Sequence, residues 1–194
     1  PIPGGFDKEM ILKQLKDALP QLLEASPEET LEIKGILKIK YKKIPTDPQK
    51  VAETLGKDLG GGMIPQETID EYMGMFEKDI TLVLNTALED IGTFEVLKEL
   101  KIKSKTIPVG VHRFGIEFDG ERPKSIRIFN ADKEKLKKAV ELRLKTKSTD
   151  LQAELAVKLK EPKKQKEGKE KFEMHLAFLR YKAKTKSKVQ VSGK

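Results

Sequence analysis

The sequence contains no cysteine, and this absence removes several kinds of chemistry. Without thiols the chain can have no disulfide, no thiolate zinc site and no cysteine nucleophile. Tryptophan is also absent, and histidine occurs only as His112 and His175. We expect no secretory signal before Pro1, and the lack of cysteine makes a reducing cytoplasm the expected location.

Long apolar runs are missing as well. No stretch approaches the roughly 20 apolar residues of a membrane-spanning helix, so we expect no membrane insertion. Arginine is scarce, because 34 of the 39 basic residues are lysine. Lysine is a hydrated point charge on a flexible stem, whereas arginine is the planar fork that reads bases and carboxylates in a bidentate manner. The composition therefore favours electrostatic contact over sequence-specific recognition.

Recognisable catalytic and cofactor motifs are absent too. The glycines at 60–62 lack the Gly-Lys-Ser/Thr ending of a phosphate-binding loop and are expected to form a turn between two helices. No Gly-x-Ser-x-Gly elbow or EF-hand loop occurs. His112 is expected to pack in the core, and His175 to lie on the surface or, less favourably, to contact phosphate. We therefore predict a protein that is not an enzyme, with no catalytic residue, metal or cofactor.

Positive charge is abundant and unevenly distributed. The chain carries a net charge of +8. Residues 158–194 contain 12 lysines and one arginine against four acidic residues, an excess of nine positive charges. Residues 1–157 are therefore nearly neutral, and a general enrichment in lysine does not explain this asymmetry. The basic excess near the carboxyl end is the strongest functional signal in the sequence.

Helical periodicity dominates the first half. Apolar residues recur at helical spacing over residues 6–25 and 65–92, with Pro20 expected to kink or split the first helix and Gly92 expected to cap the second. A shorter helix is expected to begin after Asp47. Between them, residues at about 30–43 alternate between apolar and charged, which predicts one half-buried strand.

Strand-like alternation dominates after residue 92. Short apolar runs with a period of two are separated by turn signals such as Asp119-Gly120 and Gly168. Residues 133–147 fit either a short helix or a strand. We therefore predict an α+β fold, with a mainly helical region over residues 1–92 followed by an antiparallel meander or set of hairpins over residues 93–194. These regions could be two domains or one continuous domain.

A lysine-rich hairpin near the carboxyl end is the candidate site. If residues 151–160 pair with 171–182, the charged segment 161–170 forms a long tip that is expected to project as a flexible arm. Beyond it, lysines occupy every second position from 182 to 188. In an extended strand they would lie about 6.6 Å apart, comparable to the spacing of phosphates along a nucleic-acid strand.

The candidate nucleic-acid-binding residues combine the tip, this row of lysines and the two residues before the row. Arg180 is expected to lie in register with the row, and Tyr181 to stack on a base. The full set is Lys163, Lys164, Lys166, Lys169, Lys171, Arg180, Tyr181, Lys182, Lys184, Lys186 and Lys188.

Three functions remain open at this point. We favour non-specific, salt-sensitive binding of DNA or RNA by the lysine-rich segment. The alternative is a structural or assembly protein, such as a homo-oligomeric particle, tail or filament subunit, whose basic hairpin contacts its neighbour. A polybasic membrane-surface module ranks third, because the segment lacks an amphipathic helical pattern and a lipidation signal. Lysines that only keep an exposed edge strand soluble would also fit.

Overall fold

The computed structural model describes residues 8–47, 50–51, 67, 71, 75, 77–130 and 138–193. The glycines at 60–62, most of the helix expected after Asp47, and residues 131–137 lie outside these ranges. No helix among the described residues is long and apolar enough to cross a membrane.

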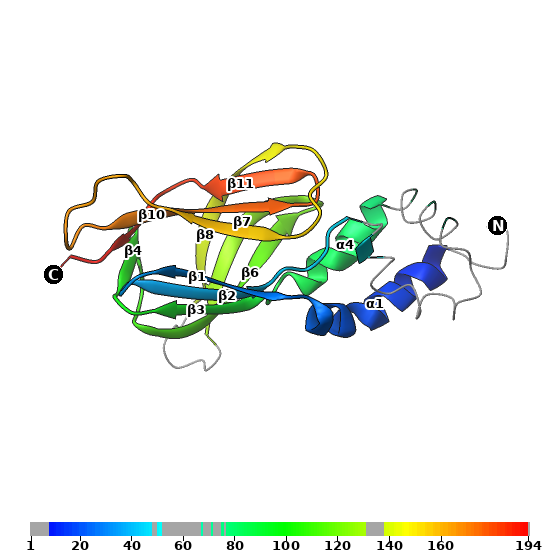
Figure 1. Ribbon diagram of the computed structural model, residues 1–194, viewed down its shortest axis with the longest axis horizontal. Helices are drawn as coiled ribbons and strands as arrows, with labels where there is room; N and C mark the ends of the chain where they lie inside the picture. Colours follow the sequence, from blue (N-terminus) through cyan, green and yellow to red (C-terminus); the bar gives the residue numbers. More distant parts are fainter. Residues whose placement is uncertain are drawn as a thin grey trace.

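Two described helices pack together at one end of a large antiparallel sheet (Figure 1). They are α1 (Lys8–Ala25) and α4 (Glu77–Ala87). The strands are β1 (Glu28–Ile33), β2 (Leu37–Lys42), β3 (Gly92–Val96), β4 (Leu100–Ile102), β5 (Lys105–Ile107), β6 (Gly110–Asp119), β7 (Arg122–Phe129), β8 (Val140–Ser148), β9 (Ala156–Lys160), β10 (Lys171–Phe178), β11 (Tyr181–Thr185) and β12 (Val189–Val191). The fold is therefore α+β and mostly sheet, as the coarse sequence reading predicts.

All strand pairs are antiparallel, in the order β1-β2-β3-β6-β7-β8-β11-β10-β12-β4-β5, with β9 on β10. The sheet forks between β11 and β12. β11 pairs with β8, whereas β12 pairs with β4, and both β11 and β12 pair with β10. Residues 186–188 connect the two strands at the fork. Strands from both halves of the sequence share this sheet, because β2 pairs with β3.

The single strand predicted over residues 30–43 is wrong, because this segment forms the β1–β2 hairpin. Gly35 has a φ of 74°, a left-handed conformation that glycine adopts without steric cost. The Ile36 N–H donates to the Ile33 carbonyl across the turn (2.9 Å). Ile36 is the one exception to the alternation through the turn, so periodicity alone reveals the reversal only weakly. The acidic pair Glu28 and Glu29 begins β1.

The structure also bears on the expectations for Pro20 and Gly92. Helix α1 continues through Pro20 and is not split there. Helix α4 ends at Ala87, and Gly92 begins β3 instead of capping the helix. A Cβ atom at Gly92 would lie 1.9 Å from the Lys40 carbonyl oxygen of the neighbouring β2. Glycine is therefore required at this position by the close approach of two strand backbones.

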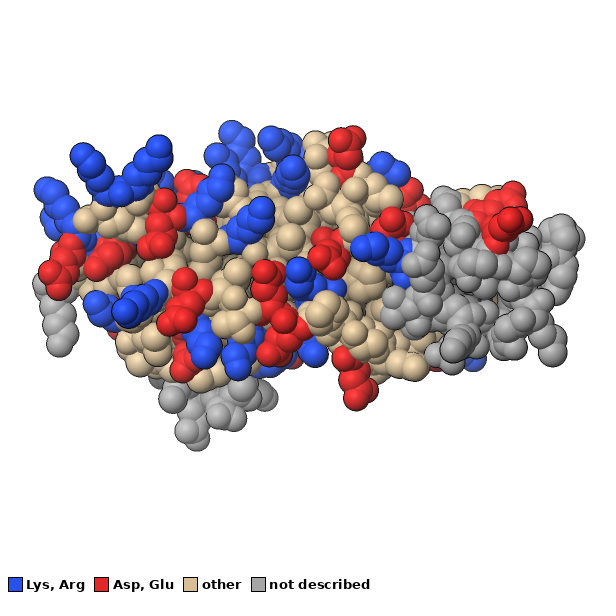
Figure 2. Space-filling model, in the orientation of Figure 1, with Lys and Arg blue, Asp and Glu red and all other residues tan. Residues whose placement is uncertain are grey.

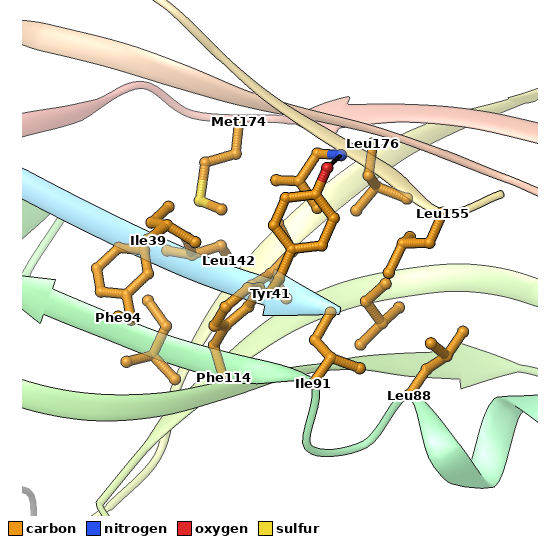
Figure 3. Close-up of a cluster of buried hydrophobic side chains, with 14 of the residues drawn as sticks. Ile39, Tyr41, Leu88, Ile91, Phe94, Phe114, Leu142, Leu155, Met174 and Leu176 are labelled. Carbon is orange, nitrogen blue, oxygen red and sulfur yellow. Dashed lines mark hydrogen bonds between the residues drawn. The ribbon is translucent and has the colours of Figure 1, made fainter. Parts of the chain in front are cut away.

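The core lies between the layer formed by β2 and β3 and the layer that contains β10 (Figure 3). The Tyr41 ring lies among buried apolar side chains from both layers, and the residue is 1% exposed. Its hydroxyl donates to Glu29 Oε2 on β1 (2.5 Å) and accepts from the Val157 N–H on β9 (3.0 Å). Tyr41 therefore links two strands that do not pair with each other. Burial, and then the hydrogen bond to Glu29, raise the pKa of Tyr41.

We predict that Tyr41→Phe lowers the free energy of unfolding by about 1–3 kcal/mol, because the Val157 N–H loses its partner while the ring packing is kept. Urea unfolding measures the loss, and Tyr181→Phe serves as a matched control on the half-exposed tyrosine of β11.

A tyrosine whose pKa is higher in the folded state stabilises the protein below its unfolded pKa of about 10, and this contribution disappears as the pH rises. The difference between wild type and Tyr41→Phe should therefore narrow above that pH. Equal stability of both variants at neutral pH would contradict the assigned role.

Candidate functional site

Six lysines lie on the solvent-facing side of the four adjacent strands β8, β11, β10 and β9. Side chains alternate strictly between core and solvent along β8 from Val140 to Lys145 and along β11 from Lys182 to Thr185. The same alternation places Met174 and Leu176 of β10 in the core and His175 between them on the outer side. We call the resulting surface the lysine face. It consists of Lys145 and Lys147 on β8, Lys182 and Lys184 on β11, and Lys158 and Lys160 on β9.

The strand register brings these lysines directly opposite one another. Lys145 pairs with Lys184, and Lys147 pairs with Lys182. Directly opposed side chains on one face have Cβ atoms about 4.5–5.5 Å apart. His175 continues the first row, since it lies opposite Lys184 on one side and Lys158 on the other. The row Lys145, Lys184, His175 and Lys158 therefore crosses four strands without an acidic side chain.

The other outer surface of the sheet has a different charge pattern. On β1, β2 and β3, Lys38 lies opposite Glu32 and Glu95, and Lys42 lies opposite Glu28. Opposite charges across strands stabilise a sheet, and like charges directly opposite destabilise it. Figure 2 shows basic and acidic side chains mixed over β1–β3 and mainly basic ones along the upper edge, over β10 and β11. The like-charge rows of the lysine face are therefore a local property of these strands.

One acidic residue, Glu173 on β10, lies on the same side of the sheet as His175 and directly opposite Lys160 of β9. Its Oε2 lies 3.0 Å from His175 Nε2. This hydrogen bond lowers the pKa of the Glu173 carboxyl, and the positive charges of His175, Lys184 and Lys188 act in the same direction. Glu173 therefore opposes Lys160, whereas the register places no carboxylate directly opposite the pairs Lys145–Lys184 and Lys147–Lys182. In the described part of the chain, none of the six lysines forms an ion pair.

A shallow groove of about 470 Å³ follows the lysine face. Its walls include five of the six face lysines and His175, with Thr146 and Ala183 at its floor. Apart from the imidazole of His175, the outward side chains of these four strands contain no aromatic ring among the described residues. The groove therefore offers ammonium groups to an anionic ligand but no platform for stacking a base.

The structure places the predicted lysines in four parts of the fold. Lys182 and Lys184 lie on the lysine face, and Lys186 and Lys188 are exposed in the fork that follows β11. Lys171 begins β10. The remaining lysines, Lys163, Lys164, Lys166 and Lys169, lie in the 161–170 connection between β9 and β10.

The 161–170 connection makes its own hydrogen bonds. The Gln165 side chain accepts from the Lys171 N–H (2.6 Å), and the Glu170 carbonyl accepts from the Val191 N–H of β12 (2.8 Å). These bonds tie the end of the connection to the sheet beside β12.

Arg180 does not lie where the sequence pattern predicts, and Tyr181 does not share a face with the lysines. Arg180 is in the β10–β11 turn, where its Nε donates to Glu77 Oε1 of α4 (2.7 Å). It thus holds a helix against the sheet and is not in register with Lys182. Tyr181 opposes Phe178 and lies on the opposite side of β11 from the lysines. Arg180 stands two residues before Lys182, so strand alternation would place both on one face. Strand β11 begins only at Tyr181, however, and Arg180 lies in the turn before it.

Four lysines of the face were missed by sequence reasoning. Lys158 and Lys160 belong to the basic carboxyl-terminal excess, but no sequence pattern singles them out as candidate site residues. Lys145 and Lys147 precede that segment, in a stretch that was ambiguous between helix and strand. The alternation in "LRLKTKS" was visible, but the pairing of β8 with β11 is non-local.

Two other observations bear on the chemistry of the molecule. His112 is fully buried, and its Nε2 lies 2.8 Å from the Pro108 carbonyl oxygen, as expected for a packed core histidine. Within the described ranges no group of three or more histidine and acidic side chains could hold a metal ion. Comparison with protein-family models, curated proteins and solved structures finds no match, so the site is interpreted from its own geometry.

We predict that Lys145→Glu raises the free energy of unfolding by about 0.2–1 kcal/mol at low salt, because the new carboxylate opposes Lys184. Salt should reduce this gain, since it screens exposed charges. Lys38→Glu on β2 is the matched control, and it should destabilise the protein because Lys38 lies between two glutamates. Urea unfolding at two salt concentrations measures both changes. A loss of stability in Lys145→Glu would show that the lysine face carries no net repulsion.

Proposed function

We propose that this protein is a non-enzymatic nucleic-acid-binding protein with low sequence specificity, and that the lysine face is its main contact surface. The observation that carries the proposal is the direct opposition of Lys145 with Lys184 and of Lys147 with Lys182. Such pairs cost stability in the free protein. An anionic ligand that lies across both strands would turn this repulsion into favourable contacts.

The extent of the lysine face favours a polyanion over a small anion. Neighbouring strands are about 4.8 Å apart, so the four strands from β8 to β9 span about 14 Å. Along each strand the outward lysines repeat about every 6.8 Å. A phosphate backbone offers regularly spaced charges over this distance, whereas one small anion would neutralise a single pair.

The composition of the face favours contact with phosphates over reading of bases. Lysine does not present the bidentate fork by which arginine recognises guanine. Tyr181 directly precedes Lys182 in the sequence, but its side chain lies on the opposite side of β11 from the lysine face. We therefore propose that the protein binds DNA or RNA through its backbone, with strong salt dependence.

The lysines of the 161–170 connection extend this proposal. Three of them, Lys163, Lys164 and Lys166, follow Lys160 within six residues. As a lysine-rich hairpin tip, they would continue the positive surface beyond β9, together with Lys169 and Lys171. Lys186 and Lys188 would continue it beyond β11. Arg180 is not part of the proposed contact, because it is paired with Glu77.

One observation favours the assembly alternative. Leu97, Val109 and Val111 are 42%, 55% and 54% exposed, and the β3–β6 register places Val111 opposite Glu95, with Leu97 and Val109 just beyond the paired residues. Three exposed apolar side chains at one end of a strand pair suit a contact with another protein surface. A homo-oligomeric subunit that uses this end is therefore the second candidate.

We predict that the wild-type protein binds a short DNA or RNA duplex and that Lys147→Gln/Lys182→Gln weakens this binding about tenfold or more at low salt. The slope of log affinity against log salt should also fall by about 2, one for each lost phosphate contact. Fluorescence anisotropy over several salt concentrations measures both quantities.

The double variant Lys38→Gln/Lys40→Gln on the outer side of β2 is the control, because it removes the same charge from a surface where acidic residues are interleaved. Its affinity should stay within about twofold of wild type. Equal weakening by both double variants would show that only net charge matters. Absence of nucleic-acid binding, together with a defined oligomer in light scattering, would favour the assembly alternative.

A further inference from the structure

The fork in the sheet opens a second cationic pocket next to the lysine face. β11 ends its pairing with β8 at Thr185, which lies opposite Leu144, and the Lys186 N–H then donates to the Arg143 carbonyl (2.8 Å). From there the chain leaves β8, and β12 pairs with β4. A pocket of about 330 Å³ lies between β8 and the β4–β5 hairpin at this point.

The pocket concentrates positive charge and hydroxyl groups in a small volume. Its lining residues are Ile102, Lys103, Ser104, Lys105, Glu141, Arg143, Lys186 and Ser187. Four are cations, two are serines, and one is an acid. In the part of the chain that the structure describes, none of the four cations forms an ion pair. A neighbouring pocket of about 590 Å³ shares Arg143 and Lys186, so a larger ligand has room to extend outwards.

The turn that forms one wall contains an unusual backbone conformation. Lys103 has a φ of 52° and is exposed. A left-handed conformation is unfavourable for a residue with a Cβ atom, and turns normally place glycine or asparagine there. Leu179 has a similar φ of 51°, but its side chain is 4% exposed and packs in the core, which explains the choice of residue. The exposed Lys103 side chain has no such packing in the core. Glycine would suit this backbone conformation better, but it would lack the ammonium group that Lys103 brings to the pocket.

We propose that this fork pocket binds a single phosphomonoester dianion. Arg143 supplies the guanidinium fork that matches two phosphate oxygens. Lys103, Lys105 and Lys186 supply further charge, and the hydroxyls of Ser104 and Ser187 can donate to the remaining oxygens. The site differs from the lysine face because it is compact and contains an arginine. Glu141 is the one lining residue that opposes an anion, and it limits the affinity.

Two sources can present this group. One is a small phosphorylated molecule or free phosphate, and the other is the terminal phosphate of a nucleic-acid strand that lies along the adjacent lysine face. Both share the same chemistry at Arg143. The second source depends on the function proposed above, whereas the first does not.

The test uses the full chain and inorganic phosphate as the first probe, with binding followed by calorimetry and by amide chemical shifts in NMR. We expect saturable binding at one site. Arg143→Lys, which keeps the charge but loses the fork, should weaken binding about tenfold. Lys103→Gly should weaken binding as well and should raise the melting temperature, because it relieves the left-handed conformation. Glu141→Gln should strengthen binding.

Lys40→Gln on the outer side of β2 is the control and should leave phosphate affinity unchanged within about twofold. A 5′-phosphorylated oligonucleotide and its 5′-hydroxyl counterpart form the second arm. If wild type prefers the 5′-phosphorylated oligonucleotide and Arg143→Lys loses this preference, the pocket binds the ends of nucleic-acid strands. If wild type binds both oligonucleotides equally, the pocket binds small phosphates. Absence of saturable phosphate binding by the folded wild-type chain, or equal affinity in wild type, Arg143→Lys and Lys103→Gly, overturns the proposal.

Discussion

The alternation of side chains along β8 and β11 is the constraint on which the candidate site depends. Leu142 and Leu144 are buried, as are Ala183 and Thr185, so the outward positions between them face solvent together. A shift of one residue would bury lysines and expose the apolar set, so the core fixes the register. The register in turn places Lys145 opposite its partner on β11. The charged surface is therefore a consequence of how the interior packs.

The same core makes the repulsion tolerable. Each like-charge pair costs roughly 0.2–1 kcal/mol, whereas burying one large apolar side chain contributes about 1.5–3 kcal/mol. The Tyr41 hydroxyl adds hydrogen bonds to Glu29 of β1 and Val157 of β9, two strands that do not pair with each other. Glu77 and Arg180 join α4 to the β10–β11 turn. The burial of apolar side chains therefore outweighs the repulsion between the opposed lysines.

Sequence reasoning predicted the parts that depend on local pattern. The α+β class, helix α1 and the packing of His112 all follow from periodicity and burial. The predictions that failed concern chain reversals and non-local contacts between strands. Alternation continues through Gly35, so one strand was predicted where a hairpin forms. Gly92 is fixed by a contact with β2, more than fifty residues away in sequence.

The candidate site shows the same division. Lys182 and Lys184 were found because they alternate within one segment, whereas Lys145 and Lys147 join them only through non-local pairing with β8. Arg180 was misplaced by extending the strand pattern into a turn. Charge composition could indicate a basic end of the chain, but only the strand order could show which cations share a surface.

The central claim is that like charges oppose each other on the lysine face and that a polyanion relieves this repulsion. A double-mutant cycle with Lys145→Gln and Lys184→Gln measures the coupling between the two side chains directly. The claim predicts an unfavourable coupling free energy in the free protein that disappears when the protein is saturated with duplex nucleic acid. A coupling of zero or of favourable sign in the free protein would contradict it.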